Sequence, residues 1–84
     1  HFYNHTYKVG LEKALNIWVK NCPKSAYPLY KRGRFYQHFG QEAKCEENYR
    51  KALEINPACA PAAYRLALTL CMQKKYKEAV EEYD

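Results

Sequence analysis

The sequence predicts an all-α protein built from repeated helix–turn–helix units, and three observations lead to this prediction. Apolar residues recur at steps of three and four along most of the chain, which is the spacing of one face of a helix. Two similar stop signals, at Asn21-Cys22-Pro23 and Asn56-Pro57, each contain a proline, which does not continue a helix. We call the separation of Pro23 and Pro57 (57 − 23 = 34) the repeat interval. No segment alternates apolar and polar residues with the period of two that strands show.

We expect about five helices, separated by short turns that make neighbours antiparallel. Their ranges are about 7–21, 26–39, 41–55, 61–73 and 76–83. Ser25 is a suitable cap for the second helix, and Gly40 a suitable left-handed residue after its end. In chain order, the residues expected to face the core are Leu11, Leu15, Trp18, Val19, Leu29, Gly33, Tyr36, Phe39, Cys45, Tyr49, Ala52, Leu53, Ala63, Leu66, Ala67, Leu70, Tyr76, Ala79, Val80 and Tyr83.

The charges are unevenly distributed along the chain. The 84 residues carry 14 basic and 9 acidic side chains, for a formal net charge of +5. No acid occurs between Glu12 and Glu42, and the basic residues of this interval are Lys13, Lys20, Lys24, Lys31, Arg32 and Arg34. Such a cluster is either a patch for an acidic peptide or for phosphates, or the solvated side of ordinary helices.

Cysteine and histidine spacing indicates no metal site. The four cysteines include no C-x-x-C pair, and the three histidines match no ligand spacing. We interpret the cysteines as reduced, mostly buried thiols of a reducing compartment, which favours an intracellular and most simply a cytoplasmic protein. The longest uncharged run, 58–64, is too short to span a bilayer, so we expect no membrane insertion. The start at His1 and the end at Asp84, inside an expected helix, suggest a piece of a longer chain.

No group of residues indicates catalysis, so we expect a non-enzymatic protein without a cofactor. A triad of Ser25, His38 and Asp84 has no supporting motif. Cys45 falls at an expected core position, which disfavours it as a nucleophile beside His38. The acids around Glu46 fit a solvated helix face, with Glu46 placed to pair with Arg50 at i+4.

The chain resembles the tetratricopeptide repeat family. The family pattern of W-x2-L-G-x2-Y, then A-x3-F, a second small residue and P falls in the middle of the chain on Leu29, Arg32, Gly33, Tyr36, Cys45, Tyr49, Ala52 and Pro57. Steps of one repeat interval extend the match to Ala63, Leu66, Ala67, Leu70, Ala79 and Tyr83 in one direction and to Leu11, Leu15, Trp18 and Pro23 in the other. Arg32 departs from the pattern because it stands where the family has a buried leucine, and Leu11 and Trp18 are bulky where the family prefers small residues. Trp18 would either widen the first helix crossing or fill a capping surface, which leaves open whether it belongs to the core or to an interface.

This resemblance implies antiparallel helix–turn–helix repeats stacked as a short right-handed α-solenoid. Residues 1–25 would be the second helix of a preceding repeat, residues 26–59 a complete repeat, and residues 60–84 a partial one. The implied function is protein–protein interaction within a larger scaffold or multi-subunit assembly. The residues that would line the concave groove are Tyr27, Tyr30, Arg34, Gln37, His38, Tyr64, Arg65, Leu68, Cys71 and Met72.

The resemblance implies a protein or peptide partner, and the basic cluster favours a partner segment with acidic character. Some family members clamp a C-terminal carboxylate, and Arg65 matches one clamp position, whereas Pro61 and Lys31 stand where that clamp has Lys and Asn. An alternative is an RNA-associated scaffold similar to half-a-tetratricopeptide proteins. It would use the basic cluster from Lys20 to Arg34 on phosphates, with tyrosine rings stacking on bases.

Overall fold

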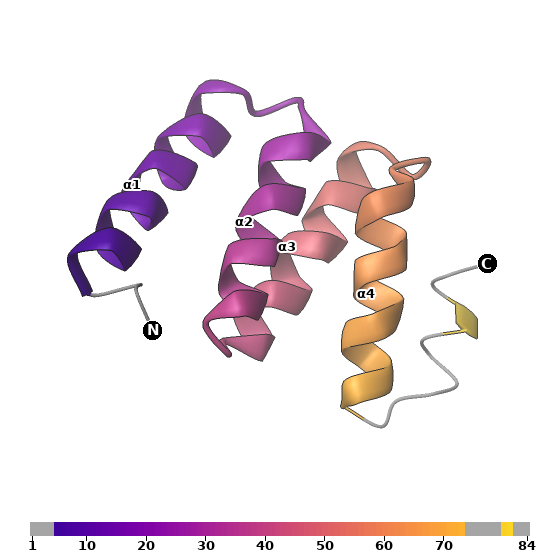
Figure 1. Ribbon diagram of the computed structural model, residues 1–84. Helices are drawn as coiled ribbons and strands as arrows, with labels where there is room; N and C mark the ends of the chain where they lie inside the picture. Colours follow the sequence, from indigo (N-terminus) through magenta and orange to yellow (C-terminus); the bar gives the residue numbers. More distant parts are fainter. Residues whose placement is uncertain (1–4, 74–79, 82–84) are drawn as a thin grey trace.

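The protein is all-α in the part of the chain described by the computed structural model, which comprises residues 5–73, 80 and 81. Four helices follow one another: α1 (His5–Asn21), α2 (Ala26–His38), α3 (Glu42–Ile55) and α4 (Ala60–Met72) (Figure 1). These residues contain no strand, which confirms the predicted class.

The expected number of about five helices is wrong for the described residues, which form four. The fifth, expected over 76–83, lies outside them apart from Val80 and Glu81. The core positions expected at Tyr76, Ala79 and Tyr83 also lie outside the described residues. Val80, which was expected to face the core, is exposed.

The helix boundaries recur at the spacing seen in the sequence. Helices α2 and α4 begin (26 and 60) and end (38 and 72) one repeat interval apart, and α1 and α3 also end (21 and 55) one repeat interval apart. The turns recur as well. Ser25 N–H donates to the Cys22 carbonyl over 3.1 Å, and the equivalent Cys59 N–H donates to the Asn56 carbonyl over 3.0 Å. The same local backbone structure therefore reverses the chain after α1 and after α3.

The residues between the helices follow the expected stop signals, with one difference. Gly40 has φ +75°, the left-handed conformation that glycine adopts without a Cβ clash. Ser25 stands at the N-cap of α2, but its side chain makes no capping hydrogen bond there. Consecutive helices run in opposite directions (Figure 1), as the short turns require.

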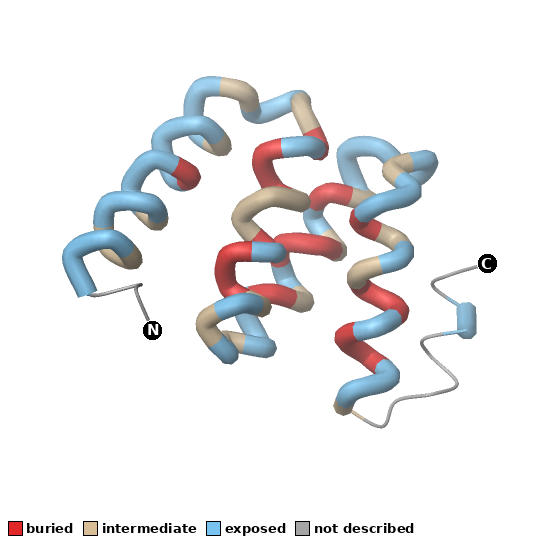
Figure 2. The backbone as a smooth tube through the Cα atoms, viewed as in Figure 1, coloured by how far each residue is buried: buried red, intermediate tan, exposed pale blue. Residues whose placement is uncertain are grey.

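Helix α2 is the centre of the structure, because it contacts α1, α3 and α4. The buried residues form two adjoining clusters, which lie mainly along α2, α3 and α4 and include Leu15 of α1 (Figure 2). Tyr49, Cys45 and Ala52 of α3 and Leu66 and Leu70 of α4 are completely covered. These are residues that the helical periodicity predicts to be buried.

Helix α1 differs from this pattern, and two of its expected core residues are exposed. Leu15 is buried, whereas Leu11 and Trp18 lie at the surface. The physical reason is that, within the described residues, α1 contacts α2 and no other helix. Helix α3 is covered by both α2 and α4.

Arg32, at the position where a buried leucine was expected, connects three helices. Its Nε donates to Asn48 Oδ1 of α3 over 2.7 Å, and its Nη1 donates to Asn16 Oδ1 of α1 over 3.0 Å. Asn48 is itself buried and donates to the Lys44 carbonyl over 2.8 Å. Arg32 is half-buried, and its guanidinium is hydrogen-bonded to both neighbouring helices.

Candidate functional site

The candidate site begins with one side of α2, which we call the α2 face: Tyr27, Tyr30, Lys31, Arg34 and His38. These residues follow one another at steps of one, three and four, so they lie along one side of the helix. Tyr27, Arg34 and His38 are exposed, and Tyr30 and Lys31 are half-buried. The α2 face is therefore a surface that combines aromatic and basic side chains.

Aromatic rings pack against the α2 face from α1 and from α3. Trp18 meets Tyr27 edge-on with 5.6 Å between ring centroids, Tyr27 lies 5.8 Å from Tyr30, and Tyr30 lies 6.2 Å from the buried ring of Tyr49. This row of rings connects α1, α2 and α3. Trp18 was not among the groove residues expected from the sequence, which left open whether it belongs to the core or to an interface.

Two cations are held over this row of rings. Lys31 Nζ lies 5.8 Å from the centroid of Tyr27, and the guanidinium carbon of Arg34 lies 6.0 Å from that of Tyr30. Arg34 Nη1 also donates to the Tyr30 hydroxyl at 3.5 Å, a long contact. Cations over aromatic faces are attracted by the ring quadrupole, so the rings restrain both charges near the surface of α2.

Helix α4 adds an apolar surface next to α2. Tyr64, Leu68 and Met72 are exposed along one side of α4, and Arg65 is half-buried. Of the residues expected in the groove, Cys71 is also exposed. Exposed aromatic and basic groups of α2 and exposed apolar groups of α4 thus lie on two helices that contact each other.

Gln37 has a different surrounding from the other expected groove residues. Its Oε1 accepts a 2.9 Å hydrogen bond from the Tyr49 hydroxyl, and its Nε2 donates to Thr69 Oγ1 of α4 over 3.4 Å. Thr69 in turn donates to the Arg65 carbonyl over 2.9 Å. The amide of Gln37 therefore links α2, α3 and α4 beneath the site.

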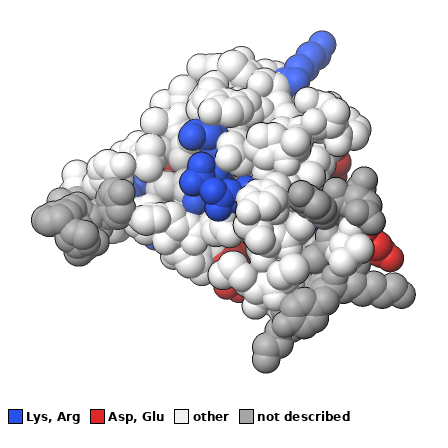
Figure 3. Space-filling model, turned by 45° about the vertical axis from the view of Figure 1, so that its right-hand side comes forward, with Lys and Arg blue, Asp and Glu red and all other residues white. Residues whose placement is uncertain are grey.

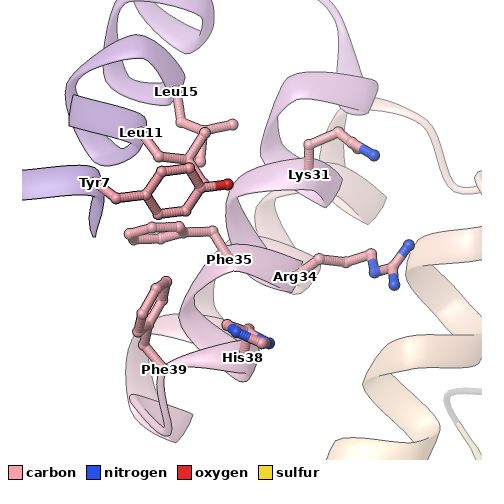
Figure 4. Close-up of a pocket in the computed structure, with 8 residues that line it drawn as sticks. All are labelled: Tyr7, Leu11, Leu15, Lys31, Arg34, Phe35, His38 and Phe39. Atoms are coloured by element: carbon pink, nitrogen blue, oxygen red, sulfur yellow. The ribbon is translucent and has the colours of Figure 1, made fainter. Parts of the chain in front are cut away.

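A hollow of about 440 Å³ lies between α1 and α2. Figure 4 shows Tyr7, Leu11 and Leu15 of α1 gathered opposite Phe35 and Phe39, while Lys31 and Arg34 extend away from this apolar group. His38 completes the lining. Lys8 Nζ lies 5.3 Å from the centroid of Phe39. The hollow has an apolar floor and a basic edge, and it was not predicted from the sequence.

The basic residues of the sequence cluster have unequal surroundings. Arg32 is engaged by Asn48 and Asn16, whereas Lys20, Lys24 and Arg34 are exposed. In the view of Figure 3, several Lys and Arg side chains gather on one area surrounded by uncharged atoms. The carboxylate of Glu12 contacts α2, because its Oε2 accepts a 2.7 Å hydrogen bond from the Tyr36 hydroxyl.

The buried titratable groups belong to the packing of the helices. Burial raises the pKa of the Cys45 thiol, which is completely covered and lies 3.6 Å from Thr69 Oγ1. Burial, with the hydrogen bond to Glu12, raises the pKa of Tyr36 to about 12. Burial also raises the pKa of Tyr49. The expected Glu46–Arg50 ion pair is present at 3.1 Å.

The four cysteines are free thiols, but they are not mostly buried as expected. Only Cys45 is buried, whereas Cys22 and Cys59 are half-buried and Cys71 is exposed. The reason is their position, because Cys22 and Cys59 lie in the turns after α1 and α3 and Cys71 lies on the outer side of α4.

Two further observations concern metals and membranes. Among residues 5–73, 80 and 81, no three His, Cys, Asp or Glu side chains are grouped so that they could hold a metal ion. Within the same residues, no helix combines the length and the apolar character needed to cross a membrane.

Comparison with protein-family models gave no match, and comparison with curated proteins found no significant relative.

Proposed function

We propose that this protein is a non-enzymatic protein–protein interaction module of tetratricopeptide type that acts as part of a larger scaffold. Three observations support the proposal. The boundaries of α2 recur in α4 after one repeat interval (60 − 26 and 72 − 38), the turns after α1 and α3 have the same structure, and α2 packs closely on α3 where Gly33 meets Tyr49. Stacked units of this kind present extended surfaces for binding.

The single observation that carries the binding role is the combined surface of α2 and α4. Tyr27 and Arg34 are exposed on α2, and Tyr64, Leu68 and Met72 on α4. Exposed apolar side chains that lie together, rather than singly, mark interaction surfaces. The helices beneath them are linked by a hydrogen bond between Gln37 and Thr69, so this surface is preorganised and a partner need not order it.

The chemistry of this surface defines the partner segment. Tyrosine rings offer a large contact area at low entropic cost, and Met72 offers an adaptable apolar contact. Arg34 can bind a carboxylate with two hydrogen bonds. The segment that fits is a peptide with apolar residues and at least one acidic group, bound across α2 and α4.

The test is the capture of partners with the longest natural form of the protein, using matched variants. We expect Leu68→Asp with Met72→Asp to abolish retention of specific partners, because the charges are placed in the apolar part of the surface. Ile17→Asp is the control, since Ile17 is exposed and lies two residues from the buried Leu15, on another side of α1. Equal retention by all forms would refute the proposed surface, provided that circular dichroism shows equal helicity.

Nuclease treatment of half of each sample decides between protein and nucleic acid. Partners that persist after treatment support the protein-binding module. Partners lost on treatment, with binding that weakens steeply as salt is added, would replace it by the RNA-associated alternative based on Lys20, Lys24 and Arg34.

A further inference from the structure

We infer that the hollow between α1 and α2 is a docking site for an acidic amphipathic helix of another protein. The incoming helix would pack on α1 in the manner in which α2 packs on α3. This inference rests on the proposed function, because it specifies a partner that reaches the same α2 face.

Residues of α1 and α3 that stand one repeat interval apart differ in their exposure to solvent. Leu11, Leu15 and Trp18 of α1 precede Cys45, Tyr49 and Ala52 of α3 by one repeat interval (45 − 11, 49 − 15 and 52 − 18). The three residues of α3 are 0% exposed, whereas Leu11 is 36%, Leu15 7% and Trp18 38% exposed. Two of the three positions that are fully covered in α3 are thus exposed in α1, and the third, Leu15, is buried.

The cause of this difference is the number of neighbouring helices. Helix α3 lies against α2 and α4, and α1 lies against α2 alone within the described residues. The side of α1 that no other described helix covers is the side that corresponds to the α2–α3 contact. A helix placed there would cover Leu11 and Trp18, and the burial of their apolar surface is favourable.

The second argument comes from the wall of the hollow on α2. Phe35 precedes Thr69 by one repeat interval (69 − 35), and Thr69 is the residue through which α4 contacts Gln37 of α2. The side of α2 that carries Phe35 therefore corresponds, one repeat interval earlier, to the side of α4 that faces α2. Phe35 lines the hollow together with Leu11 and Leu15 (Figure 4). An incoming helix would contact α1 and α2 at once, as α2 contacts both α3 and α4.

The third argument is charge. Lys31 and Arg34 line the α2 side of the hollow, with their charged ends extending away from its apolar floor (Figure 4), and Lys8 Nζ lies 5.3 Å from the centroid of the Phe39 ring. Glu12 of α1 accepts the hydrogen bond of Tyr36. Since Lys31, Arg34 and Lys8 lie beside the apolar floor, a helix with Asp or Glu along the border of its apolar side is complementary to them, and one with Lys or Arg is not.

The shape of the α2–α3 contact indicates what the incoming helix needs at its centre. Gly33 allows α2 to approach the ring of Tyr49. Leu15 stands at the position of that ring in α1. A small residue, glycine or alanine, opposite Leu15 would permit the same close approach.

The experiment uses a fluorescent, hydrocarbon-stapled peptide helix of about 16 residues, long enough for four turns. It carries leucines around a central alanine on one side and glutamates along the adjoining edge. Binding to the full chain is measured by fluorescence anisotropy. Two matched peptides serve as controls: one with lysine in place of every glutamate, and one with a central proline and no staple, which cannot form a helix.

We expect the acidic helix to bind at least tenfold more tightly than either control peptide, a difference of about 1.4 kcal/mol. Leu11→Asp should remove this binding, because it places a charge on the apolar floor at a position exposed enough to leave the fold intact. Lys31→Glu with Arg34→Glu should reverse the preference between the acidic and the basic helix. Ile17→Asp, on another side of α1, should change neither the affinity for the acidic helix nor the preference for it over the basic helix.

Several outcomes would overturn the inference. Binding of the acidic helix that is unchanged in Leu11→Asp would show that the hollow is not the site. Equal binding of the proline peptide would show that a helix is not required. Sedimentation of the chain alone as a dimer that Leu11→Asp dissociates would show that a second copy occupies the hollow.

The same variants separate this inference from the proposed function. Leu68→Asp with Met72→Asp abolishing partner capture, together with unchanged binding of the acidic helix to the Leu11→Asp protein, would retain the interaction module and reject the helix-docking site. If the acidic helix binds as expected while capture is insensitive to changes on α4, the docking site remains and the α2–α4 surface is rejected.

Discussion

Gly33 of α2 lies so close to the ring of Tyr49 of α3 that no larger residue fits. A Cβ added to Gly33 would be 2.6 Å from Tyr49 Cε1 and 2.7 Å from its Cδ1. The ring cannot easily move, because Tyr49 is completely covered and its hydroxyl donates to Gln37. The crossing of α2 and α3 therefore depends on the absence of one methyl group.

Gly33→Ala should lower the free energy of unfolding by about 1–3 kcal/mol, the usual range for overpacking. The clash outweighs the gain in helix propensity of at most about 1 kcal/mol. Gly10→Ala is the matched control, since Gly10 lies within α1 and its added Cβ would meet nothing within 4 Å. Urea denaturation should show Gly10→Ala to be as stable as the wild type or more stable. A Gly33→Ala protein that is also stabilised would contradict the close contact.

Asn48→Ala should destabilise the protein by about 1–2 kcal/mol, because it removes the buried acceptor of Arg32. Arg32→Ala should have a similar effect. In a double-mutant cycle, the coupling between the two residues should be about 1 kcal/mol. Strictly additive effects would mean that the hydrogen bond between Arg32 and Asn48 contributes nothing to stability. Asn16→Ala should cost less, since Asn16 is exposed.

Stability should fall between about pH 10 and pH 12, partly through Tyr36. Its pKa is about 12 in the folded protein, against an ordinary value of 10.0. Between these values the unfolded chain loses the phenolic proton first, so the folded state binds more protons and becomes less stable as pH rises. Below pH 10 the full contribution of Tyr36 to the free energy of unfolding is present. Tyr36→Phe should remove a part of this alkaline loss on the order of 2 kcal/mol, measured by urea denaturation across this range and compared with the exposed Tyr27→Phe.

Thiol reactivity should distinguish Cys45 from Cys71. Cys45 is completely covered and its pKa is raised by burial, whereas Cys71 is exposed. Since the thiolate is the reactive form, Ellman's reagent should modify Cys71 rapidly and Cys45 only at the rate of unfolding. Cys71→Ser should remove the fast phase, and denaturant should make Cys45 reactive. Rapid modification of Cys45 in the native protein would contradict its burial.

Much of the fold was predictable because it depends on local rules. Helix boundaries follow from proline, from glycine at φ +75° and from apolar periodicity, and these act within a few residues of the chain. The burial of Gly33, Tyr49 and Leu66 was predicted from the same periodicity.

The candidate site was only partly predictable. The α2 face follows from helical spacing, which places Tyr27, Tyr30 and Arg34 on one side. The exposure of Trp18 and Leu11 did not follow, because it depends on how many helices cover α1. The hollow between α1 and α2 was missed for the same reason, since its walls come from two helices and no local pattern describes the space between them.

The sequence by itself determined the helical class, the repeat interval and the side of each helix that contains apolar residues, because each depends on interactions between near neighbours in the chain. The tertiary structure alone decided which apolar residues are covered and where Arg32 finds its partners. It also decided that the amide of Gln37 joins three helices. These properties depend on contacts between residues far apart in sequence, so the number and position of neighbouring helices settle them.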